Sequence, residues 1–250
     1  TILNPIHANV MASLRALEAE SSRYLAWFVY PQLAVAEPAP GRWELRGRFM
    51  QMLEDYMAQT FAQNHTVLLN LATQPCWLFG GPNRSAANCS SARNPDQTNF
   101  QWNSEALKRA NLLDPSGGQL SDYYVNLYQY LTRGWFVTEG RNVSGGPAWS
   151  LAGQGIELFN EVVGEHGYSM SEYNLDYDHI IGRLNTEVFG GVFPRPSFTG
   201  VDGSGASDWV RAFLDPANHR DTWRNGTAAP KDAFSLHYYC PWPGSAVQRG

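Results

Sequence analysis

Helix-like and strand-like segments alternate along most of the chain, and this alternation limits the fold more than any other feature. Apolar residues recur at helical spacing over 9–19, 49–61, 121–133, 171–184 and 207–214, with Ser121 as the expected cap of the third helix. Short apolar runs typical of buried strands follow at 23–28, 66–71, 155–161, 197–201 and 233–239. Strands this apolar that alternate with helices indicate an α/β fold with a parallel sheet covered by helices.

The number of helix-strand units favours part of a barrel. A closed (β/α)8 TIM barrel needs eight strands, and the sequence offers five, the last of which ends shortly before Gly250. We therefore expect residues 1–250 to form one incomplete catalytic barrel domain that holds about strands two to six and is truncated at both ends.

The charge of the chain and the length of its apolar runs exclude two classes of partner. The 250 residues carry a formal net charge of -5 and contain no run of Lys and Arg, so nucleic acid is not an expected partner. No apolar run reaches the roughly 18 residues that a membrane-spanning helix requires, so no membrane span is expected.

Five Asn-X-Ser/Thr sequons favour a secretory route, and hence a secreted glycoprotein. They begin at Asn64, Asn83, Asn88, Asn142 and Asn225.

The three cysteines leave their redox state open. Cys76 and Cys89 are close enough in sequence to form a disulfide in an oxidising compartment. Cys240 is then either a buried thiol or the partner of a cysteine outside this chain. Alternatively, all three are reduced.

The pair Asn160-Glu161 ends the third apolar run, just before a polar turn. The catalytic groups of (β/α)8 barrels lie where strands run out into loops, and glycoside hydrolysis needs a carboxylic acid at such a position. The alternative is an ordinary loop carboxylate beside a capping Asn.

Together these residues resemble a clan A glycoside hydrolase, most closely family 39, which includes β-xylosidases and α-iduronidases. In that clan, strand four ends in an Asn-Glu pair whose Glu is the acid/base, an Arg ends strand two, and a His or Tyr ends strand six. The resemblance places Asn160 and Glu161 on strand four, Arg23 on strand two, and His237 and Tyr239 on strand six.

The resemblance implies a retaining glycosidase that acts on a carbohydrate without a cofactor. Glu161 would be the general acid and then the base, and the amide of Asn160 would bind the 2-hydroxyl of the sugar. Arg23, which has no acidic neighbour in the local sequence, would keep the nucleophile ionised. His237 or Tyr239 could hydrogen-bond that nucleophile. The alternatives are a turn cap for Asn160, a surface ion pair for Arg23, and core packing for the last two.

Other residues near the expected mouth of the barrel are weaker candidates. Trp27 and Trp77 would offer flat faces to a sugar ring, although tryptophan is equally common in cores. Glu165 and His166 follow the acid closely and are more readily explained as solvated loop residues.

The sequence departs from the family pattern at two points. Val162 follows the Asn-Glu pair where family 39 usually has Pro. The nucleophile, a second Glu that ends strand seven in the clan, is expected beyond Gly250. Glu187 superficially resembles it but follows the helix after strand four, so it should lie at the opposite, stabilising face of the barrel.

Two other readings remain. A catalytically inactive glycan-binding barrel protein would fit, because no second site carboxylate is evident in the sequence. A metal site built from His166, His179, His237 and Cys240 lacks any recognised zinc spacing, so no metal is expected.

Overall fold

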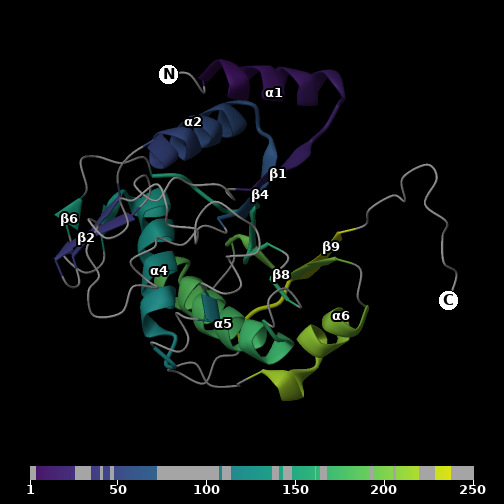
Figure 1. Cartoon of the computed structure of the whole chain (residues 1–250). Coiled ribbons are helices and arrows are strands. Elements are labelled where there is room, and N and C mark those ends of the chain that lie inside the picture. The colour runs from purple at the N-terminus through teal and green to yellow at the C-terminus, as the bar shows by residue number, and fades with distance from the viewer. Residues whose placement is uncertain are drawn as a thin grey trace, which may run out of the picture.

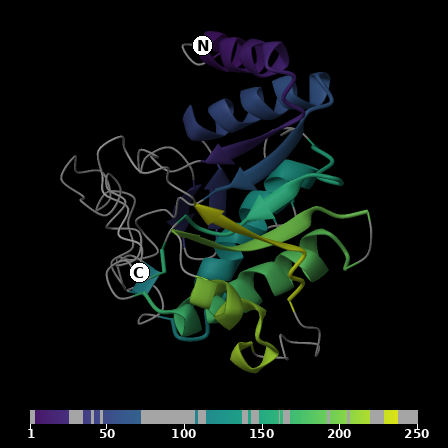
Figure 2. The ribbon, with the colours of Figure 1, turned by 90° about the vertical axis from the view of Figure 1, so that its right-hand side faces the viewer.

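A parallel five-stranded sheet lies at the centre of the molecule. The computed structural model describes residues 4–25, 35–39, 42–45, 48–71, 107–108, 114–136, 141–142, 148–160, 162–163, 168–191, 194–204, 207–219 and 229–237. The strands of the sheet are β1 (Ser21–Leu25), β4 (Thr66–Asn70), β7 (Gly155–Glu157), β8 (Ser197–Ser204) and β9 (Ala233–His237). They pair in chain order, and every pair is parallel, so their arrowheads point to one side in Figure 2. The expected α/β fold with a parallel sheet is confirmed.

Helices connect the strands and flank the sheet, as parallel strands require (Figure 1). They are α1 (Asn4–Ala16), α2 (Arg48–Ala62), α4 (Gly118–Arg133), α5 (Met170–Arg183) and α6 (Ser207–Leu214). A π-helical segment, η5 (Leu184–Val188), extends α5, and a short 3-10 turn, η6 (Pro216–Asn218), follows α6. Among the helices described, none is long and apolar enough to cross a membrane.

The strand register separates a polar face of the sheet from an apolar one. Asn70 pairs with Glu157, and Arg23 pairs with the residue two positions before Asn70. Because side chains alternate along a strand, the side chains of Arg23, Asn70 and Glu157 lie on the same face of the sheet. The opposite face contributes Leu69 and Ile156 to a core that the helices complete. The polar face is therefore the one on which a site can be built.

Helix α4 begins earlier than the sequence predicts, and Ser121 is not its cap. The N-cap is Gly117, whose φ of 66° lies in the left-handed region. Ser121 sits within the first turn, where its hydroxyl donates to the Gly117 carbonyl at 2.8 Å. Asp114 takes over the capping role by accepting from the Gln119 amide at 2.9 Å. The prediction was wrong because a carboxylate before the glycines substitutes for the serine.

The third strand of the sheet, β7, is shorter than the predicted run 155–161. β7 ends at Glu157, and Phe159 has a φ of 62°, in the left-handed region and far from the regular β conformation. Asn160 therefore lies in the loop after the strand rather than on it.

Two small antiparallel hairpins were not predicted. The first pairs β2 (Val35–Ala39) with β3 (Arg42–Leu45), and the second pairs β5 (Trp135–Phe136) with β6 (Arg141–Asn142). Both lie in connections between the main elements, and runs this short carry no clear periodicity.

Candidate functional site

Arg23 on β1 joins acidic and amide groups from distant parts of the chain. Its Nε donates to Oε2 of Glu157 on β7 at 2.5 Å, and its Nη2 donates to Oδ2 of Asp202 on β8. The same Nη2 donates to Oδ1 of Asn160 at 3.1 Å. One guanidinium thus links the strand β1 to the ends of two other strands.

Glu157 is the most enclosed member of this cluster, with its side chain 0% exposed. Besides Arg23, it accepts from Asn70 Nδ2 at 2.8 Å and from the Ser235 hydroxyl on β9. A buried carboxylate is tolerated only when its oxygens are hydrogen-bonded, and here both are. Asn70 also donates to the carbonyl of Phe159, which fixes the backbone just before Asn160.

Asp202 reaches the cluster because β8 carries a β-bulge. Gly200 pairs with Phe234 and Gly203 with Leu236, so Val201 and Asp202 together lie opposite Ser235. The extra residue reverses the alternation of side chains and turns Asp202 toward Arg23, where an unbulged strand would turn it toward the helices.

The charges in the cluster do not balance one to one. Arg23 is the only cation that contacts the carboxylates of Glu157 and Asp202 in the hydrogen bonds above, and it is also the most exposed of the three, at 28%. Besides pairing with both carboxylates, Arg23 holds Asn160 in one orientation.

The orientation of Asn160 follows from this contact. Its Oδ1 faces Arg23, so its Nδ2 faces away, and within the described part of the chain no acceptor meets that nitrogen. The residue is only 2% exposed, yet Nδ2 is not among the buried unpaired atoms. Asn160 therefore keeps a hydrogen-bond donor that none of the described residues uses.

The structure brings two of the sequence-predicted residues together, Arg23 and Asn160. His237 ends β9 as expected, although its side chain is not described. The other candidates lie outside the described residues: Trp27, Cys76, Trp77, Cys89, Glu161, Glu165, His166, Tyr239 and Cys240.

The prediction that Arg23 lacks an acidic partner holds only for the local sequence. Its partners Glu157 and Asp202 are 134 and 179 residues away, so no local pattern reveals them. The one available signal is the charge of Glu157 itself, which stands between two apolar residues of a short strand.

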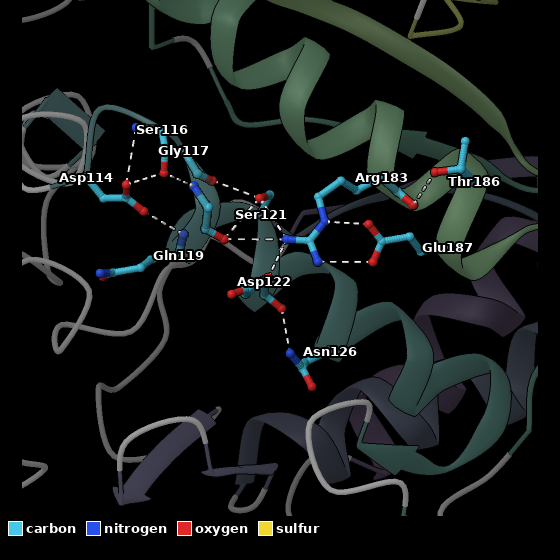
Figure 3. Close-up of polar contacts among 11 residues, drawn as sticks. Asp114, Ser116, Gly117, Gln119, Ser121, Asp122, Asn126, Arg183, Thr186 and Glu187 are labelled. Carbon is cyan, nitrogen blue, oxygen red and sulfur yellow. Dashed lines mark hydrogen bonds and ion pairs between the residues drawn. The ribbon is translucent and has the colours of Figure 1, made fainter. Parts of the chain in front are cut away.

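Glu187 belongs to a separate network that ties α5 to α4 (Figure 3). Its two oxygens accept from Nε and Nη2 of Arg183 at 2.8 and 3.0 Å, and Nη1 of Arg183 donates to Ser121 at 3.0 Å and to Asp122. Burial acts to lower the pKa of the Arg183 guanidinium, but the hydrogen bonds to Glu187 and Asp122 outweigh it, and the pKa is raised. The printed contacts of the Glu187 side chain are with Arg183, so it takes no part in the cluster around Arg23.

No group of three or more His, Cys, Asp or Glu side chains that could hold a metal ion occurs within the ranges described above. His179, one of the four proposed metal ligands, instead lies under the turn before α4, where a Cβ on Gly117 would meet its Nδ1 at 2.3 Å.

Comparison with known proteins gives no relative. No protein-family model, no curated protein and no solved structure matches the chain.

Proposed function

We propose that the chain is the larger part of a (β/α)8 barrel from a secreted retaining glycoside hydrolase, in which Glu161 is the general acid and base. The observation that carries the proposal is the contact between Arg23 and Asn160, the residue that directly precedes Glu161. Both residues belong to the pattern on which the resemblance to clan A glycosidases rests.

The arrangement of the strands supports the barrel. The repeating unit of a (β/α)8 barrel is one strand followed by one helix. Five parallel strands pair in chain order here, and helical connections join them. The cluster around Arg23 draws on all five strands or the loops that directly follow them, and active sites of such barrels lie at the carboxyl ends of the strands. Numbered as in a full barrel, β1 would be strand two and β9 strand six.

The donor presented by Asn160 suits a sugar hydroxyl. Its Nδ2 would donate to the oxygen of the 2-hydroxyl, a contact that strengthens as the transition state gains oxocarbenium character. Arg23 would act by holding the amide in this orientation, since Glu157 and Asp202 already offset its charge. This assigns Arg23 to positioning rather than to keeping the nucleophile ionised.

The reaction would proceed in two steps. Glu161 first gives its proton to the glycosidic oxygen while a second carboxylate, roughly 5 Å away, attacks the anomeric carbon and the leaving group departs as an alcohol. Glu161 then takes a proton from water, which attacks the same carbon and releases the second carboxylate. That nucleophile would come from a strand that follows β9 in a complete barrel.

The test is hydrolysis of a panel of aryl glycosides by the complete protein, with the first-formed anomer identified by NMR. We expect release of the aglycone and a first product with the configuration of the substrate. Inversion would contradict the two-step mechanism. Sugar binding by calorimetry without turnover of any substrate would instead support the inactive glycan-binding alternative.

A further inference from the structure

Two residues of the cluster follow strained backbone. Phe159, with a φ of 62°, directly precedes Asn160, and Val201, with a φ of 34°, directly precedes Asp202. A positive φ is unfavourable for any residue with a Cβ and most of all for a β-branched one such as valine. Conformations of this kind persist only where the surroundings hold them, and they concentrate at functional sites.

One side chain from outside the sheet contacts both strained segments. The hydroxyl of Tyr173, on α5, donates to the carbonyl of Leu158 at 3.3 Å and accepts from the amide of Val201 at 2.9 Å. It therefore bridges the chain just after β7 to the bulge in β8. Both contacts lie within two residues of a cluster member, Asn160 in the first case and Asp202 in the second.

The hydroxyl replaces a partner that the bulge removes. Val201 lies between the two stretches of β8 that pair with β9, so its amide needs an acceptor from elsewhere. A buried amide without a partner costs about 1–3 kcal/mol, and Tyr173 meets this need.

The surroundings keep Tyr173 in one place and in one protonation state. The side chain is almost fully buried and meets the rings of Phe159 and Phe213 edge-on, with centroid distances of 6.1 and 6.0 Å. Burial first, and then neighbouring negative charge, raises the pKa of the Tyr173 hydroxyl. The group therefore remains a donor to the Leu158 carbonyl over the whole range in which proteins are folded.

We propose that Tyr173 is a positioning residue that holds the bulge of β8 and the loop after β7 together, so that Asp202 and Asn160 meet Arg23 at the same time. Its structural effect is independent of the reaction, whereas its effect on turnover rests on the proposed glycosidase function. It touches none of the groups proposed to react, and acts through the backbone on either side.

Tyr173→Phe removes the hydroxyl alone, and Tyr177→Phe is the matched control. Tyr177 lies one turn later on α5, is equally buried and packs against the same Phe213, but its hydroxyl donates to the carbonyl of Pro230, before β9. Loss of either hydroxyl should lower the melting temperature of the complete protein to a similar extent, so stability alone does not distinguish them.

The first measurement is NMR, which does not depend on enzymatic activity. The guanidinium NMR signals of Arg23, assigned by their loss in Arg23→Lys, should shift or broaden in Tyr173→Phe and stay unchanged in Tyr177→Phe. In the wild type, the amide of Val201 should exchange its hydrogen only on global unfolding, although it lies in a bulge. Rapid exchange of that amide, or an unchanged Arg23 signal in Tyr173→Phe, would overturn the proposal.

The second readout is kinetic. With a good aryl glycoside substrate, Tyr173→Phe should lower kcat by about 10²-fold, because misplacing a positioning group by even 1 Å has an effect of this size, while Tyr177→Phe stays within a factor of about 2. Equal losses in both variants would mean that Tyr173 is merely structural. If even the wild type hydrolyses nothing, the glycosidase proposal fails, and the Arg23 signals still decide the role of Tyr173.

Discussion

At Arg23, a single side chain meets three acceptors from two segments, the end of β7 and the bulge of β8, and the site depends on both being in place. The fork of the guanidinium suits this task, because its donors have fixed directions and a lysine offers only a point charge. Nε of Arg23 donates to Glu157, and Nη2 donates to both Asp202 and Asn160. Asn160, the residue of the proposed substrate contact, is thus held in place through Arg23.

Glu157→Gln tests this anchoring role. The change keeps the shape of the side chain and removes the charge that Arg23 meets in a buried setting. We expect a loss of about 3 kcal/mol of unfolding free energy, at the low end for a broken buried ion pair because Arg23 is partly exposed. Chemical denaturation measures it.

Asp208→Asn is the control for Glu157→Gln. Asp208 pairs with Arg211 at 3.7 Å, but both side chains are more than 80% exposed. Ion pairs in that setting contribute almost nothing, so the control should unfold as the wild type does. A similar loss in the two variants would mean that Glu157 is not an anchor.

Strand β8 contributes both to the cluster around Arg23, through Asp202, and to the core, through its contact with α6. Gly200 precedes the bulge, and a Cβ at that position would lie 2.0 Å from Cζ of Phe213 on α6. The close approach of α6 to β8 therefore requires glycine, and the bulge that turns Asp202 inward begins at this residue.

Gly200→Ala should destabilise the protein by about 1–3 kcal/mol, because the methyl group forces α6 away from β8. Gly118→Ala, at the start of α4, should be neutral or stabilising, since its nearest neighbours are side-chain oxygens at 3.3 and 3.4 Å. Melting temperatures compare the two. Adding Phe213→Leu should recover part of the loss at Gly200, and no recovery would mean that the contact is not the cause.

The start of β8 is fastened to the start of β9 by an ion pair. Arg195 Nη1 and Nη2 donate to the two oxygens of Asp232 at 2.5 and 3.0 Å, and the Phe198 amide donates to Asp232 at 2.8 Å. The hydrogen bond from Arg195 is the main cause of a lowered pKa of the Asp232 carboxyl, whose ordinary value is 3.8.

This ion pair predicts a specific dependence of stability on pH. A depressed pKa in the folded state stabilises the protein above the unfolded value near 3.8 and ceases to do so as the pH falls through the folded value. Wild type should therefore exceed Asp232→Asn in unfolding free energy by a constant amount from pH 7 to pH 5, and the difference should shrink below about pH 4. A difference that is independent of pH down to about pH 2 would contradict the assignment.

Periodicity located the elements that bury a regular face. Helices α2, α5 and α6 and strand β4 lie within about one residue of their predicted bounds, because each helix has a repeating apolar face and β4 is a short apolar run. Periodicity failed to locate boundaries that other features determine. Asp114 takes the place of Ser121 in capping α4, and β7 ends early because Phe159 adopts a left-handed conformation.

Only some residues of the cluster could be predicted from the sequence. Arg23 and Asn160 were found through their resemblance to a family pattern, whereas Asn70, Glu157, Asp202 and Ser235 were not. Their association depends on strand order and on a bulge, and neither leaves a local trace.

For the whole molecule, the sheet gathers the cluster at one edge. Because the strands are parallel and in chain order, the loops after β1, β4, β7, β8 and β9 all begin at that edge. The ion pair between Arg195 and Asp232 lies at the opposite edge, where the chain enters β8 and β9. The cluster around Arg23 and this ion pair are thus separated by the length of the strands.

The central claim, that Glu161 is the acid and base of a retaining glycosidase, is tested most directly by Glu161→Gln in the complete protein. We predict that hydrolysis of a substrate with a poor leaving group falls by about 10²–10⁴-fold. Added azide, which attacks without losing a proton, should restore turnover of an activated substrate and give a glycosyl azide of unchanged configuration. Glu165→Gln, four residues on, should behave as the wild type. Wild-type hydrolysis by Glu161→Gln, or a loss that azide does not relieve, would contradict the account.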